Sequence, residues 1–378
     1  MFYNGRPPTT TFIAVAVGIF VVAFFFGDVF SHSALQEEFT PKESSLDDVR
    51  SVRDAVRYWR ARIRTVGPEA AYAELKRSDT SSPRNREETL VPGLQHQEAH
   101  RFGAALYQEL GTRGFSVCGT EFSYGCVHEF VGQMLADNSL SILPSLNDSC
   151  TSMTTLFDEA LCQHGLGHGV LGYFGYTERA LMKALEICRG LGVPSLPMGC
   201  YGGVFMEYNL RPLWLLPRSK SVRNPDPVGR PGLCVRVPDY ARPSCLSHLP
   251  QWWAEGDRVQ QGPKAIFALG QRCAAEVVTL PDRRSCLLGV GQFTFGPRNT
   301  LDDVSEDIQR ACGVLTDESD VSWCIIGSIV SARFYGMRFG EELCSAIKLP
   351  AERRICGSFT AGDGEVFREI GPAKLIPE

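Results

Sequence analysis

The longest uninterrupted apolar stretch of the chain lies near the N-terminus. Residues 12–27, FIAVAVGIFVVAFFFG, carry no charge, and with the three residues before them they form a segment of 19 residues. A helix that crosses a bilayer needs roughly 20 residues. Arg6 precedes this segment and Asp28 follows it, an order of charges that keeps the short N-terminus in the cytoplasm. We therefore predict a transmembrane signal-anchor over residues 9–29, with residues 1–8 cytoplasmic and the remainder exported.

A charged region follows, in which the apolar residues form a single narrow stripe. They recur at alternating steps of three and four residues, at Val49, Val52, Val56, Trp59 and Ile63. This spacing predicts a helix with one narrow apolar face, suited to a short coiled-coil seam or to docking on the main body. Pro68 is a favourable first-turn residue and predicts a second helix that ends at about Lys76. We treat residues 30–92 as a stalk with short amphipathic helices and assign no chemistry to it.

From residue 93 onward the cysteines fall into successive pairs. The two members of a pair are 11 to 13 residues apart, except in the first pair, where the separation is 8. The seven pairs are Cys118/Cys126, Cys150/Cys162, Cys188/Cys200, Cys234/Cys245, Cys273/Cys286, Cys312/Cys324 and Cys344/Cys356.

Each pair marks a helical hairpin. A helical pattern ends at the first cysteine, a polar or proline-containing turn follows, and the second cysteine opens the next helix. On one continuous helix Cys312 and Cys324 would lie ~18 Å apart, far beyond the reach of a disulfide. A helix–turn–helix unit brings the two together. We therefore favour pairing within each unit, with bridges between neighbouring units as the alternative.

The units recur with a period that is typical of stacked helical hairpins. From Cys150 onward, the first cysteines of successive pairs are 38, 46, 39, 39 and 32 residues apart. Glycine stands three residues after the second cysteine in four units, where it would let a neighbouring helix approach closely. These positions are Gly165, Gly203, Gly289 and Gly327. The sequence thus predicts an all-α fold, an array of about seven disulfide-stapled αα-hairpin repeats over residues 93–365, as an open solenoid or a closed α/α toroid. Residues 366–378 form a C-terminal tail.

Composition places this array in an oxidising compartment. Fourteen cysteines, an even number with no CxxC spacing, favour disulfides over zinc–thiolate sites or a catalytic cysteine. The net charge of -5 arises from 43 acidic and 38 basic residues spread along the chain, which gives no basic footprint for nucleic acid. A cleaved signal peptide, with its site around residues 31–33, is the alternative to the anchor. Both lead the body of the protein to a periplasm, a cell surface or a secretory lumen.

Histidine is unevenly distributed along the array. Six of the seven histidines belong to it, and five of these six lie before residue 170. His128 and His164 each follow the second cysteine of their unit by two residues, so we expect them to face each other, with His168 one turn further along. His96 and His100 have the i, i+4 spacing that places two imidazoles on one helix face.

These histidines predict a site for a divalent transition metal. Imidazole binds zinc, copper, iron and nickel, and the sequence does not select among them. The segment around His96 differs from the HExxH motif of zinc proteases, because Gln97 stands where that motif has its glutamate. The predicted ligands are His96, His100, His128, His164 and His168. The isolated His248 is interpreted as a packing residue.

Glu207 is the carboxylate that we expect to act with this site. In repeat register it lies one residue beyond the position of His168 on the next unit, so it is predicted to be the base that activates a metal-bound water. The leading hypothesis is a membrane-anchored extracytoplasmic metalloprotein whose reaction class is metal-dependent hydrolysis. The alternative is a non-catalytic scaffold that binds an exported protein or a glycan and whose histidines are structural.

Overall fold

The computed structural model describes the chain in ten segments. These are residues 52–78, 92–119, 121–153, 155–191, 198–215, 232–257, 262–292, 294, 303–334 and 337–361. All ten segments belong to one unit of the chain, Ser44–Glu378. The predicted N-terminal tail, signal-anchor and C-terminal tail lie outside the described residues. Among the helices of the ten segments, none is long and apolar enough to cross a membrane.

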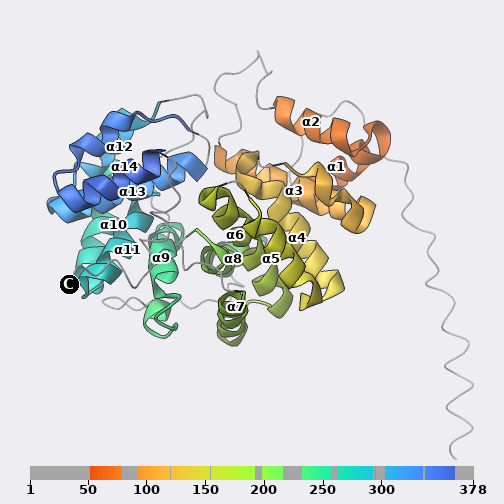
Figure 1. Ribbon diagram of the computed structural model, residues 1–378, viewed down its shortest axis with the longest axis horizontal. Helices are drawn as coiled ribbons and strands as arrows, with labels where there is room; N and C mark the ends of the chain where they lie inside the picture. The colour runs from red at the N-terminus through yellow and green to blue at the C-terminus, as the bar shows by residue number, and fades with distance from the viewer. Residues whose placement is uncertain are drawn as a thin grey trace, which may run out of the picture. The chain divides into compact units, whose positions relative to one another are not determined.

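The described segments are all-helical, apart from an isolated bridge between Asp303 and Arg338. The α-helices are α1 (Val52–Val66), α2 (Pro68–Ser78), α3 (Pro92–Leu110), α4 (Gly125–Asn138), α5 (Leu143–Thr151), α6 (Leu156–Phe174), α7 (Glu178–Gly190), α8 (Cys200–Leu215), α9 (Arg242–Asp257), α10 (Pro263–Glu276), α11 (Leu280–Gly291), α12 (Ser305–Cys312), α13 (Glu318–Phe334) and α14 (Pro350–Ala361). Short 3-10 helices are η2 (Gly111–Val117), η3 (Phe122–Tyr124), η4 (Leu140–Ile142), η6 (Gly232–Val235) and η7 (Glu341–Ala346). The predicted all-α class is therefore confirmed (Figure 1).

Several helices begin at a threonine that satisfies an otherwise unbonded backbone N–H. The side-chain oxygens of Thr155, Thr177 and Thr279 accept hydrogen bonds from the N–H groups three residues further on, at the starts of α6, α7 and α11. Such a cap contributes about 1 kcal/mol to a helix. It fixes where each helix begins.

The seven disulfides join the cysteines in the predicted local pairs. Six of them connect two helical segments that follow each other along the chain, and Cys118–Cys126 joins the end of η2 to α4, across η3. The Cα–Cα distances are 5.4 to 5.9 Å. Within the described segments, every cysteine takes part in a disulfide. The alternative of bridges between neighbouring units is therefore wrong.

The helices that carry the second cysteine of each pair, together with α3, pack in chain order. α3 contacts α4, α4 contacts α6, and the series continues through α8, α9, α11 and α13 to α14 (Figure 1). α5, α7, α10 and α12 each contact the helix that follows them and to which a disulfide joins them. One large hydrophobic cluster runs from α4 to α14 through these contacts.

Glycines allow the packed helices to approach closely, as predicted. A Cβ atom at Gly203 would lie 1.9 Å from the carbonyl oxygen of His164, and one at Gly289 would lie 2.1 Å from that of Ser247. At Gly165 the added atom would lie 2.7 Å from the imidazole of His128. In each case the residue contacted is the one two positions after the second cysteine of the preceding pair. This regular register brings the histidines of α4 and α6 together.

Replacement of Gly203 tests this packing. We expect Gly203→Ala to destabilise the protein by about 1–3 kcal/mol, because the methyl group would force α8 away from α6. Gly172→Ala, on the exposed face of α6 with nothing within 4 Å, is the matched control and should be neutral or stabilising. Urea unfolding of both variants measures the difference. Equal free energies of unfolding for the two variants would show that the close approach of α8 to α6 at Gly203 is not required.

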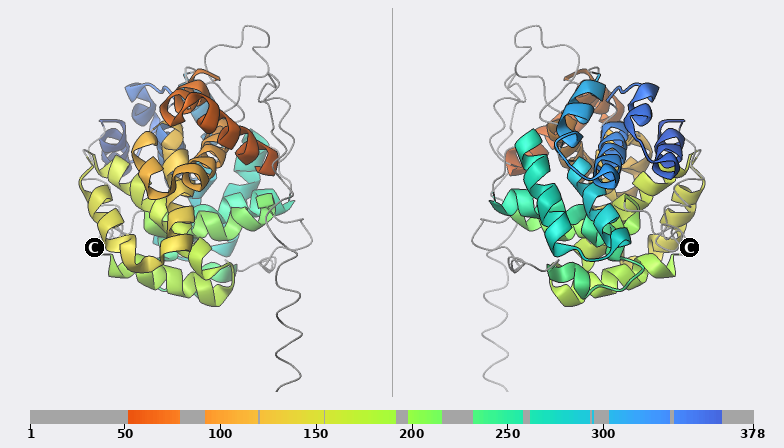
Figure 2. Two further views of the ribbon diagram at one scale, coloured as in Figure 1. Left: turned by 90° about the vertical axis from the view of Figure 1, so that its right-hand side faces the viewer. Right: turned by 90° about the vertical axis from the view of Figure 1, so that its left-hand side faces the viewer.

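The helix predicted over the apolar stripe docks on the main body. α1 contacts α3, with Trp59 fully buried against Phe102, and the indole N–H of Trp59 donates to Oε1 of Glu98 at 2.7 Å. Figure 2 shows α1, in red-orange, beside α3. Of the two roles expected for the stripe, docking is therefore the one found for residues 52–66.

Candidate metal centre

Six histidines gather where α3, α4, α6 and α9 meet. The ring centroids of His128 and His164 are 5.4 Å apart, so the prediction that they face each other is confirmed. Those of His96 and His100 are 4.6 Å apart, and His100 and His168 are separated by 5.9 Å. All five predicted ligands thus belong to one cluster. His248, interpreted from the sequence as a packing residue, extends it with its ring 6.5 Å from that of His164.

Three of these side chains can hold one ion. His96, His100 and His128 each offer one ring nitrogen, and the three nitrogens lie within 4.8 Å of one another. We call these residues the triad. The Nε2 atoms of His96 and His100 are 3.1 Å apart. Two nitrogens bound to a tetrahedral zinc ion at about 2.0 Å would be separated by about 3.3 Å, so the observed spacing fits a shared ion.

The remaining nitrogens of the triad face protein acceptors. Nδ1 of His96 donates to the carbonyl oxygen of Phe122 at 2.7 Å, and Nε2 of His128 donates to that of Leu161 at 3.1 Å. Nδ1 of His100 faces Oε2 of Glu129 at 3.6 Å. The two hydrogen bonds to carbonyl oxygens fix the tautomers of His96 and His128 and leave the lone pair of the other nitrogen for a metal.

These contacts determine where two of the three ring protons lie. Because Nδ1 of His96 carries the proton, its Nε2, which lies 3.1 Å from Nε2 of His100, presents a lone pair. Nδ1 of His128 is likewise a lone-pair acceptor, and it is buried without a hydrogen-bond partner. A cation between these nitrogens would satisfy all three.

Burial keeps the rings neutral. Desolvation lowers the pKa of His96, His128 and His164 well below the ordinary value of 6.5, and neighbouring histidines lower it further. Desolvation also lowers the pKa of His248 to about 4. These four imidazoles are therefore deprotonated at pH 7, the form that binds metal ions.

His164 and His168 lie beside the triad with their own partners. Nδ1 of His164 donates to the carbonyl oxygen of Met198 at 3.0 Å, and its Nε2 lies 3.3 Å from Sδ of Met206. Nδ1 of His168 contacts Oε2 of Glu207 at 2.8 Å, whereas its Nε2 is buried without a hydrogen-bond partner. Both side chains therefore present a nitrogen lone pair to the interior of the cluster.

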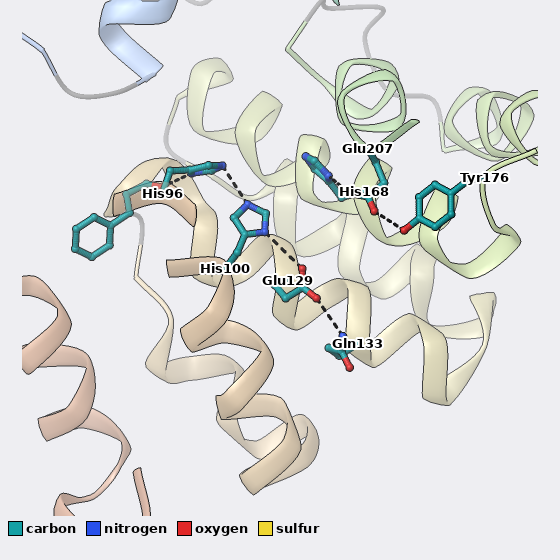
Figure 3. A network of polar contacts seen from close by, with 8 residues as sticks. His96, His100, Glu129, Gln133, His168, Tyr176 and Glu207 are labelled. Atoms are coloured by element: carbon teal, nitrogen blue, oxygen red, sulfur yellow. Dashed lines mark hydrogen bonds and ion pairs between the residues drawn. The ribbon is translucent and has the colours of Figure 1, made fainter. Parts of the chain in front are cut away.

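Glu207 lies next to His168, the neighbour expected from the repeat register. Its Oε1 accepts a hydrogen bond from the hydroxyl of Tyr176 at 2.7 Å, while Oε2 holds His168 (Figure 3). Glu129 similarly links His100 to Gln133, whose amide donates to Oε1 at 3.0 Å (Figure 3). Each carboxylate thus orients one histidine, and the role of Glu207 as a base stays a prediction.

The end of α13 closes over the cluster. The ring of Phe334 lies 5.4 Å from His96 and 6.1 Å from His164, although about 170 to 240 residues separate them in sequence. Phe334 is buried, and it places an apolar wall against two of the imidazoles. An apolar wall reduces solvent access and thereby strengthens charge interactions at a metal.

Sequence reasoning missed Met206 and Phe334. A signal for Met206 exists, because it follows Cys200 by six residues as His168 follows Cys162, so the two occupy equivalent positions of adjacent units. Its side chain is a thioether, so the pattern of histidines does not include it. Phe334 has no comparable signal, since its proximity depends on how the later helices return to α3.

Comparison with protein-family models, with curated proteins and with solved structures finds no match to this chain. The functional interpretation therefore depends on the geometry of the cluster.

Proposed function

We propose that this protein is an extracytoplasmic metalloprotein that binds a divalent transition-metal ion through the triad. The observation that carries the proposal is the convergence of three ring nitrogens within 4.8 Å of one another, with the Nε2 atoms of His96 and His100 only 3.1 Å apart. His128 supplies the third nitrogen. Seven disulfides support an oxidising, extracytoplasmic location.

Three neutral ligands suit a metal that retains one exchangeable position. Catalytic zinc sites commonly have three protein ligands and leave the fourth position to water or substrate. Glu129, 3.6 Å from Nδ1 of His100, would offset part of the charge of the ion through that ring. Metal-dependent hydrolysis is the reaction class that such a site supports. Glu207 orients His168, and its predicted role as the base would require one of its oxygens to leave its protein partner.

The surrounding architecture is proposed to be a stack of seven helical hairpins behind an N-terminal signal-anchor. The regular contact between each glycine and the preceding unit supports the stack, as do the seven local disulfides. Contact of Phe334 with His96 favours an array that returns toward its own beginning. The uncharged segment of residues 12–27 supports the anchor.

Metal analysis of a triad variant tests the function. We expect the wild-type protein to bind about one equivalent of Zn²⁺ or Co²⁺ tightly, and His96→Gln/His100→Gln to bind it at least about 100-fold more weakly, because two of three ligands are lost. Equilibrium dialysis followed by elemental analysis measures both. Substitution of Co²⁺ for Zn²⁺ also reports the coordination geometry, through the visible absorption of the bound Co²⁺.

His248→Gln is the matched control, because His248 is a buried histidine of the same cluster outside the triad. It should retain the metal. The scaffold alternative predicts that neither protein binds metal and that both variants merely lose stability. A metal-free wild type, or unchanged affinity in the triad variant, would therefore favour the scaffold.

A further inference from the structure

A second pair of lone-pair donors meets next to the triad. Nε2 of His164 lies 3.3 Å from Sδ of Met206. Since the proton of His164 is on Nδ1, where it is donated to the carbonyl oxygen of Met198, the imidazole has none to offer the sulfur. The nitrogen and the thioether thus face each other as two electron-pair donors.

A third donor comes from the same helix face as His164. The rings of His164 and His168 are 4.8 Å apart, four residues along α6. Nε2 of His168 is buried and has no hydrogen-bond partner, because Glu207 holds the opposite nitrogen. The exposed fraction of His168 is only 8%, so bulk water does not satisfy this nitrogen.

We propose that His164, His168 and Met206 form a second metal site, distinct from the triad, and that its ligand is copper(I). A thioether is a soft donor that selects copper(I) over the hard divalent ions, and imidazole binds it as well. Two nitrogens and one sulfur are a sufficient set for this ion, which accepts low coordination numbers. No residue of the triad is required.

The charge around this site fits a monovalent ion. A thioether and two imidazoles bind a metal ion as neutral donors, and the carboxylate of Glu207 contacts Nδ1 of His168. A single positive charge would therefore be paired with a single negative one. Tyr176 fixes that carboxylate from the other side, so the ring of His168 is oriented before an ion arrives.

X-ray absorption on the full-length protein tests the inference. With two equivalents of copper(I) under ascorbate, which leaves disulfides intact, we expect copper to have sulfur neighbours at about 2.3 Å, the length of a metal–sulfur bond. Met206→Leu should abolish that sulfur signal. In competition with bathocuproine disulfonate it should also release one copper equivalent at least about tenfold more readily.

Met134→Leu is the control, because Met134 is a buried methionine of α4 that belongs to a separate hydrophobic cluster with Trp59 and Phe102. Both substitutions conserve volume and should cost less than about 1.5 kcal/mol, so folding is retained. A copper spectrum with nitrogen neighbours only, or an unchanged spectrum in Met206→Leu, would overturn the proposal. Failure of the triad alone is distinguishable, since the wild type would then bind one copper equivalent and show sulfur.

Discussion

Complete reduction of the seven disulfides is expected to unfold this protein at room temperature. Each bridge closes a loop of 8 to 13 residues, and the chain-entropy treatment assigns about 3 kcal/mol to a loop of that size. Domains are usually stable by only 5–15 kcal/mol in total. Even if neighbouring bridges contribute less than additively, their joint loss exceeds what the helices retain from packing alone.

Far-UV and near-UV circular dichroism after reduction and alkylation in mild denaturant, followed by dialysis, measures this effect. The control is Cys188→Ala/Cys200→Ala, which removes one central bridge, should cost about 3 kcal/mol and should leave the fold intact. A reduced and alkylated chain that still shows cooperative unfolding would mean that the hydrophobic cluster from α4 to α14 is sufficient.

The cysteine spacing could predict the fold because local disulfides constrain local geometry. A separation of about a dozen residues is compatible with a bond only if the chain reverses between the two cysteines, so each pair implied a hairpin. The position of glycine after the second cysteine then implied which faces of successive helices meet. Gly203 and Gly289 contact the residues that this register requires.

The same register predicted that the histidines would converge but not how their rings would turn. His128 binds Leu161 through Nε2, whereas His164 binds Met198 through Nδ1, so equivalent positions present different nitrogens to the site. The choice depends on where a carbonyl of another helix lies, which is a matter of a few ångströms of helix translation. No pattern along the chain encodes it.

The division into a triad and a softer neighbouring site was hidden for the same reason. Five equivalent imidazoles were expected to form a single centre, yet only His96, His100 and His128 bring three nitrogens within 4.8 Å. His164 instead turns to the sulfur of Met206. A one-residue rotation of α8 would exchange Met206 for its neighbour, so only the packed structure identifies this donor.

Acidification is expected to destabilise the metal-free protein steeply between pH 7 and pH 4. Burial lowers the pKa of His96, His128 and His164 well below 6.5 and that of His248 to about 4. Below pH 6.5 the histidines bind protons in the unfolded chain but not in the folded protein. The free energy of unfolding therefore falls as the pH falls, until the pH reaches the pKa of each histidine in the folded protein. Each histidine that stays unprotonated in the folded protein lowers the free energy of unfolding by about 1.4 kcal/mol per pH unit in this range, which amounts to about 3 kcal/mol for His248 alone.

Urea unfolding at pH 7, 6 and 5 measures this loss, with a chelator present to keep metal away. His248→Gln should lose about 2 kcal/mol less stability between pH 7 and pH 5 than the wild type, because it lacks one histidine that is protonated only in the unfolded chain. The comparison of pH differences cancels the packing cost of the substitution itself. Carboxylates with lowered pKa, such as Glu109 and Glu121, act only below about pH 4.5 and do not contribute in this window. A stability that changes by less than about 1 kcal/mol from pH 7 to pH 5 would show that the histidines take up protons in the folded state, and hence that the cluster is open to water.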